Sequence, residues 1–197
     1  PVKIFNSYVN LAPDGSARRR ESAEFARSLR AEGLKWNFGS RRGDTRPETA
    51  MAREWFSQFG PAVRLLCECH PGTWVETPEV AARALAGFDD PRVGVIVHAF
   101  EDMETEHHIR DWFRHCGALI SHVHVRLREP DAGYLRLDRR PRAIEDRLRL
   151  LCDLGFAGTY TIEFTEGTDT DDENIEMLFE NAVADLRFIR NVLNRAC

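Results

Sequence analysis

Short apolar runs alternate along the chain with longer amphipathic stretches. The runs predict strands over residues 2–10, 34–40, 62–70, 93–100, 119–127 and 158–164. The stretches between and after them predict helices over residues 17–32, 47–59, 78–87, 104–116, 141–154 and 173–194. A unit of strand, loop and helix therefore recurs along the whole chain, and this pattern calls for a parallel sheet covered by helices.

Two of the predicted helices carry end signals as well as periodicity. Residues 170–173 (Thr-Asp-Asp-Glu) form a capping-box pattern just ahead of the last helix, and Gly155 follows the helix over 141–154. The apolar stripe of the last helix comprises Ile175, Leu178, Phe179, Ala182, Leu186, Ile189 and Leu193, and that of the earlier helix comprises Ile144, Leu148 and Leu151.

Two architectures compete for this pattern, a doubly wound open sheet and a (β/α)8 TIM barrel. Strands such as VGVIV (93–97) are apolar throughout, as expected for strands buried on both faces. No glycine-rich dinucleotide fingerprint follows any predicted strand, which weakens the doubly wound alternative. A full barrel usually needs about 250 residues, so the six βα units in this chain of 197 residues indicate a barrel that lacks its first two. Because the sequence opens directly in a strand-like run, we expect that residues before Pro1 are missing and that residues 1–197 form one N-terminally incomplete domain.

The charge and cysteine content narrow the classes of function. A formal net charge of −5 gives no electrostatic footprint for nucleic acid or for an anionic membrane surface. No apolar run approaches the roughly 20 residues of a membrane span, and no signal-peptide pattern opens the chain. The five cysteines form no CxxC pair, so we expect buried, reduced thiols at Cys67 and Cys69 and a cytoplasmic protein.

Residues that bind metals or move protons recur where the predicted strands end. In a strand, residues i and i+2 point to the same face, so the two histidines of ISHVHVR (120–126) share one side. The carboxyl ends of parallel strands meet at one edge, where the chemistry of α/β folds gathers. The strand-end residues are Glu68 and His70 (CECHPG), His98 (VIVHAF), His122 and His124 (HVHVR), and Glu163 (TIEFTE).

Taken singly, each of these residues has a simpler explanation. A lone strand histidine is usually a hydrogen-bonded core residue, and a strand-end glutamate often caps a helix or pairs with an arginine. Burying Glu68 and Glu163 in a barrel mouth is costly without a partner, however. A divalent cation held by two carboxylates and two imidazoles offsets that cost, so the set in register on four consecutive βα units predicts a metal site.

Three of these stretches also carry a family resemblance. The segments LLCECHPGTWVETPE, ISHVHVR and LCDLGFAGTYTIEFTEG resemble the xylose-isomerase-like TIM-barrel superfamily, which includes sugar-phosphate isomerases, sugar epimerases and, more distantly, endonuclease IV. The resemblance covers residues 60–166 by motif and the first 60 only by the βα pattern. It implies a TIM barrel that holds one divalent metal with Glu, Asp, His and Glu from successive strand ends.

Carried onto this sequence, the resemblance implies the metal ligands Glu68, His98, His124 and Glu163. His98 departs from the family pattern because it stands where an aspartate is usual; Asp102 is the weaker substitute. A second imidazole favours zinc, cobalt, iron or nickel over magnesium, with manganese still open. Of these, zinc, manganese and cobalt are the leading expectations, and iron and nickel come next. The same departure also fits a member that has lost its metal.

The resemblance further implies an isomerase or epimerase with a carbohydrate-like substrate. Glu68 and Glu163 would be the acid/base pair that moves a proton next to a carbonyl, with a metal-stabilised enediolate. The expected substrate contacts are His70, His122, Arg126 and Trp36, with Trp74 as a further wall, although core packing is an equal alternative for each aromatic.

Two other functions remain open from the sequence. A non-catalytic barrel that acts as a binding partner is the runner-up, and His98 favours it. Endonuclease-like hydrolysis would need three clustered metals and a basic surface, which the net charge of −5 argues against. If strands are truly absent, the barrel has open edges, and a homo-oligomer is one way to cover them.

Overall fold

The computed structural model describes residues 2–11, 15–40, 45–100 and 105–196. These residues divide into two compact units. Unit 1 comprises residues 1–97 and 114–121, and unit 2 comprises residues 98–113 and 122–197. The prediction of a single domain stays a prediction.

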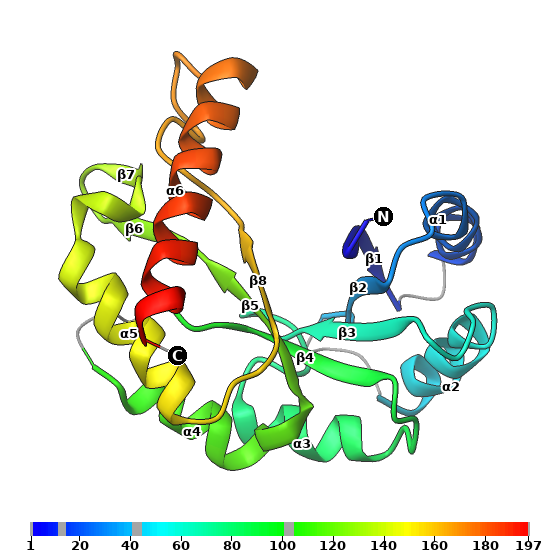
Figure 1. The fold of residues 1–197 in the computed structure, drawn as a ribbon. Helices are drawn as coiled ribbons and strands as arrows, with labels where there is room; N and C mark the ends of the chain where they lie inside the picture. The colour runs from blue at the N-terminus through cyan, green and yellow to red at the C-terminus, as the bar shows by residue number, and fades with distance from the viewer. Residues whose placement is uncertain (1, 12–14, 41–44, 101–104, 197) are drawn as a thin grey trace. The chain divides into compact units, whose positions relative to one another are not determined.

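Unit 1 is built from four parallel strands in chain order (Figure 1). These are β1 (Ile4–Asn10), β2 (Gly33–Asn37), β3 (Arg64–Glu68) and β4 (Val93–His98), whose last residue begins unit 2. Helices α1 (Ser16–Ser28), α2 (Thr45–Phe56) and α3 (Pro78–Ala86) follow the first three strands. Pro78 stands in the first turn of α3, where its missing N–H costs no helical hydrogen bond.

The core of unit 1 is aromatic. The rings of Phe38, Phe56 and Phe88 lie around Trp36, with centroid distances of 5.0, 5.1 and 5.7 Å. Trp36 itself is fully buried. These contacts fix β2 against the helices of unit 1.

Unit 2 contains β8 (Thr159–Ile162), which pairs in parallel with β5 (Ile120–Val125); the first two residues of β5 belong to unit 1. Helix α4 (His107–Cys116) precedes β5, and α5 (Pro141–Asp153) and α6 (Ile175–Ala196) flank β8 along the chain. A short antiparallel hairpin of β6 (Leu127–Glu129) and β7 (Gly133–Leu135) follows β5 (Figure 1). The sequence analysis did not predict this hairpin. Among the described residues, no helix has the length and apolar character that a membrane crossing requires.

All six predicted strands and all six predicted helices are present, with ends that differ by a few residues. Gly155 ends α5 in the left-handed conformation (φ 78°), as predicted. The predicted capping box is wrong. Helix α6 begins at Ile175, and its cap is Asn174, whose Oδ1 accepts a hydrogen bond from the backbone N–H of Met177 at 2.9 Å. Thr170 instead donates its hydroxyl to the carbonyl of Gly167.

Candidate metal centre

Three predicted ligands meet in unit 2. His98 ends β4, His124 lies in β5, and Glu163 follows β8 directly. The Nδ1 atom of His98 lies 3.4 Å from Glu163 Oε2, and the Nδ1 atom of His124 lies 3.3 Å from Glu163 Oε1. The two imidazoles are nearly perpendicular, with centroids 5.1 Å apart. We call His98, His124 and Glu163 the triad.

Strand register explains why the triad converges. In the parallel pair β5–β8, His124 is opposite Thr161. Side chains alternate along a strand, so Glu163, two residues after Thr161, emerges on the same face as His124. The backbone N–H of Glu163 donates to the carbonyl of Val125 at 3.0 Å, which extends the ladder to Glu163 itself.

The donor atoms of the triad fit a first-row divalent metal. Two imidazole nitrogens and a carboxylate are ligands that zinc and its neighbours accept. All three donor atoms lie within 4.8 Å of one another. For a metal–ligand distance of about 2.1 Å, the edge of a tetrahedral site is about 3.4 Å, close to the two Nδ1–oxygen separations.

Glu163 is held in its charged form. Burial alone would raise the pKa of its carboxyl group. Hydrogen bonds and charge interactions with His124 and His98 outweigh burial, so the pKa of Glu163 lies well below its usual range. Arg126 adds an ion pair, with Nη1 3.0 Å from Glu163 Oε2. The triad therefore offers a carboxylate rather than a carboxylic acid.

His122 and His124 differ in their surroundings although both are buried. The Nδ1 atom of His122 lies 2.7 Å from the hydroxyl of Thr159 on β8. Its ring meets that of His124 edge to face, with centroids 5.4 Å apart. His122 thus packs against a triad member while bonding to the neighbouring strand.

Glu68 lies in unit 1, at the end of β3, and has a cationic partner there. Lys35 Nζ is 2.5 Å from Glu68 Oε2, and Asn37 Nδ2 donates to the same oxygen at 2.9 Å. The side chains of Lys35 and Glu68 are each only 4% exposed. Lys35 and Asn37 were not predicted as site residues, although two polar residues at i and i+2 in an otherwise apolar strand were the available signal.

The other predicted contacts have separate locations. His70 is exposed in the loop after β3, where its Nδ1 atom lies 2.8 Å from the carbonyl of Pro71. Trp74 is half-buried, and Trp36 has the core-packing role that the sequence left open. Asp102, the substitute ligand, falls outside the described residues. Cys67 and Cys69 are buried free thiols, as predicted.

Comparison with known proteins gives matches in structure only. No family model and no curated protein matches the sequence. A xylose isomerase-like TIM barrel protein from Mycobacterium smegmatis, in complex with magnesium, matches with TM-score 0.64 and 15% identity over 97% of this chain and 74% of its own. The IOLI protein with a bound zinc atom matches with TM-score 0.66 and 13% identity over 99% and 77%.

Matches extend to proteins of different activities. An L-ribulose 3-epimerase has TM-score 0.64 and 13% identity over 98% of this chain and 74% of its own. Endonuclease IV from Thermus thermophilus has TM-score 0.65 and 17% identity over 99% and 77%. At these identities the likeness establishes architecture, not chemistry. The chain has the fold of a partial TIM barrel, with six parallel strands and alternating helices.

Proposed function

We propose that this protein is a metal-dependent isomerase or epimerase that acts on a carbohydrate-like substrate. The convergence of His98, His124 and Glu163 carries the proposal, because two imidazoles and an ionised carboxylate form a set of metal ligands. The fold supports it, since several proteins of this architecture are sugar epimerases, including D-psicose 3-epimerase from Clostridium cellulolyticum H10. We expect a small-molecule substrate and no nucleic acid, and the net charge of −5 favours this over an endonuclease-like activity.

Glu68 is the proposed fourth ligand and the second proton carrier. It is opposite Ile96 in the β3–β4 register, and His98 follows Ile96 by two residues on the same strand. This register supports the choice of Glu68 as a ligand, because side chains alternate along each strand. Because Lys35 and Asn37 both bond to Oε2, the other carboxylate oxygen, Oε1, is the one we assign to the metal.

The proposed reaction is a proton transfer next to a carbonyl. Glu163, held as a carboxylate, removes the proton from the carbon, and the C–H electron pair moves into a C=C bond as negative charge develops on the carbonyl oxygen. Lys35, whose Nζ lies 2.5 Å from Glu68 Oε2, supplies the proton that Glu68 returns to the opposite face, and the C=C electron pair moves back to the carbon as the carbonyl re-forms. A bound divalent cation supplies polarisation of the carbonyl and stabilisation of that charge. Two imidazoles favour zinc, manganese or cobalt for this role.

One observation favours a second candidate, a barrel without catalysis that serves as a binding partner. The ammonium group of Lys35 already gives the buried carboxylate of Glu68 a positive partner. A metal is then not required to offset the burial of Glu68. This candidate predicts a stable fold that binds no stoichiometric metal.

Proton exchange tests the proposed reaction on a panel of compounds, so the substrate need not be identified first. Metal-loaded protein is incubated with ketoses and sugar phosphates in D2O, and proton NMR follows loss of the C–H signal next to the carbonyl. We expect exchange with at least one compound, and at least about a hundredfold slower exchange in Glu163→Gln, which lacks the base. Equal exchange by Glu163→Gln would rule out the role given to Glu163.

A further inference from the structure

A pocket in unit 2 adjoins the triad and is lined by two arginines. Its volume is about 520 Å³, and its walls include Phe100, Arg126, Arg128 and Pro130. Arg126 also forms the ion pair with Glu163 at 3.0 Å, so it belongs to both the pocket and the triad's surroundings. Leu127, between the two arginines, is buried. Arg126 joins β5 to β6, and Arg128 lies in β6. Both line the pocket, whereas Leu127 does not.

Each of these arginines is held against an aromatic ring. The guanidinium of Arg126 lies over the ring of Phe164 at 5.8 Å, and that of Arg128 lies over the ring of Tyr134 at 5.7 Å. The rings of Tyr134 and Phe164 contact each other, with centroids 4.7 Å apart and planes inclined by 33°. The β6–β7 register sets Arg128 opposite Tyr134. A cation–π contact favours one placement of a guanidinium while its in-plane N–H groups can still bond to carboxylates or phosphates.

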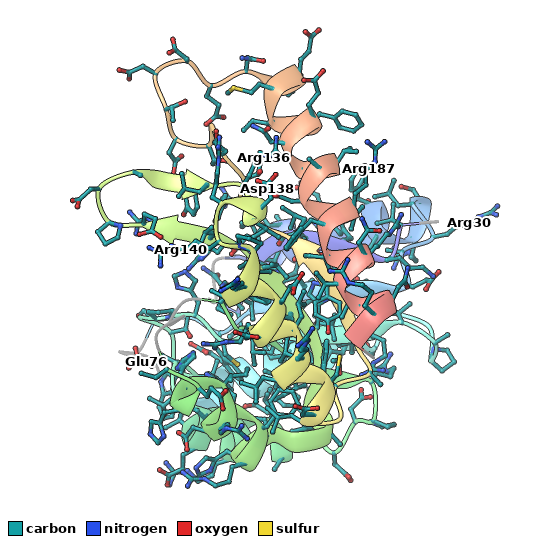
Figure 2. The ribbon with its side chains drawn as sticks, turned by 60° about the vertical axis from the view of Figure 1, so that its left-hand side comes forward. Arg30, Glu76, Arg136, Asp138, Arg140 and Arg187 are labelled. Atoms are coloured by element: carbon teal, nitrogen blue, oxygen red, sulfur yellow. The ribbon has the colours of Figure 1, made fainter. Side chains whose placement is uncertain are left out.

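Arg128 differs from the neighbouring arginines in its ion-pair partners. Arg136 pairs with Asp138 (Figure 2). Arg139 and Arg140 likewise pair with acidic partners, Glu166 at 3.0 Å and Glu129 at 2.6 Å. Within the part of the chain that the structure describes, no carboxylate lies within ion-pair distance of Arg128. This guanidinium therefore brings positive charge to the pocket wall.

We propose that the pocket binds an oxyanion of the substrate, a carboxylate or a phosphate group, through Arg126 and Arg128. This inference rests on the proposed function and narrows its substrate class to acidic carbohydrates, either sugar acids or sugar phosphates. Two guanidiniums that line one pocket match the planar, bidentate recognition that such anions receive from arginine. The link from Arg126 to Glu163 brings the anion-binding end of the substrate next to the proposed base.

Anion binding is measured on the protein itself, without turnover. Protein treated with EDTA and labelled with nitrogen-15 is titrated with inorganic phosphate and, separately, with acetate at constant ionic strength. The readout is the NMR signals of the arginine Nε–H groups, which are assigned through Arg126→Lys and Arg128→Lys. We expect saturable shifts of these two signals, and a Kd at least about tenfold weaker in Arg128→Gln. Tighter binding of phosphate selects sugar phosphates, and tighter binding of acetate selects sugar acids.

Arg190→Gln is the matched control, because it removes the same charge from an exposed arginine on α6. Its Kd should equal that of the original protein, and circular dichroism checks the fold of each variant. Arg128→Lys keeps the charge but loses the planar fork, so its Kd should also rise. The proposal is overturned if neither anion saturates the signals or if Arg190→Gln weakens binding as much as Arg128→Gln. Because EDTA removes metals, the anion titration does not depend on the metal site. Absence of anion binding would therefore not contradict the metal-dependent reaction, and absence of a bound metal would not contradict the anion site.

Discussion

Lys35 Nζ lies 2.5 Å from Glu68 Oε2, and these two charged groups are almost fully withdrawn from solvent. They join the middle of β2 to the end of β3, and Asn37, the last residue of β2, bonds to the same carboxylate oxygen. The ring of Tyr8 covers Lys35, with its centroid 4.4 Å from Nζ. Such a pair contributes little net energy while intact, but it leaves an uncompensated buried charge when one partner is removed.

Replacing Lys35 should therefore destabilise the protein strongly. We expect Lys35→Met to lower the free energy of unfolding by about 3–5 kcal/mol. Lys3→Met is the control, because Lys3 pairs with Glu32 at 2.7 Å but both side chains are exposed. An exposed pair contributes about 0–1 kcal/mol. Urea unfolding measures both variants, and equal losses would contradict the burial of the Lys35–Glu68 pair.

The two histidines of β5 should differ in their effect on metal affinity. His124 lies 3.3 Å from Glu163, whereas His122 bonds to Thr159. We expect His124→Ala to weaken cobalt binding by at least about a hundredfold, and His122→Ala by about tenfold, as for a residue that supports a ligand. Visible absorption of bound cobalt follows both titrations. A greater loss in His122→Ala would reverse the assignment.

The sequence predicted the βα pattern and the triad for the same reason. His98, His124 and Glu163 lie at or next to the ends of predicted strands, and parallel strands bring their ends to one edge. It did not predict the β6–β7 hairpin, because each strand has only three residues and offers too little alternation to identify. The Lys35–Glu68 pair was missed because a single lysine in an apolar strand gives no indication of its partner. That pairing depends on register, which the strands set only once they assemble.

The position of the N-cap of α6 at Asn174 leads to a separate prediction about stability. Asn174 accepts a hydrogen bond from the N–H of Met177, whereas Thr170 bonds within the preceding loop. Asn174→Ala should cost about 1 kcal/mol of unfolding free energy. Thr170→Ala should cost clearly less, because it removes no helix cap. Thermal unfolding measures the stability of both variants. A larger loss of stability in Thr170→Ala would show that residues 170–173 do cap the helix.

Asp90 should make stability depend on pH. Hydrogen bonds from the Arg92 side chain, which outweigh burial, hold the pKa of the Asp90 carboxyl below its usual value. A carboxyl group whose pKa falls on folding stabilises the protein above its unfolded pKa of about 3.9. That contribution is lost as the pH falls through the lower, folded pKa. The direction follows because protonation removes the charge that Arg92 binds.

Asp90→Asn should therefore be less stable than the original protein at pH 7, by about 1–2 kcal/mol. The difference should shrink as the pH falls below about 4. Urea unfolding at a series of pH values checks this, with Glu79→Gln as the control for an exposed ion pair. A difference that grows toward acid pH would have the wrong sign for the Asp90–Arg92 pair.

The central proposal is that the triad holds one divalent metal, with Glu68 as the proposed fourth ligand. Elemental analysis of the purified protein tests it most directly, beside the same analysis of a Glu68→Ala, His124→Ala double variant. We predict about one equivalent of zinc, manganese or cobalt per chain in the original protein and almost none in the double variant. Absence of metal from the original protein, even after reconstitution with each of these ions, would contradict the account and favour the barrel without catalysis.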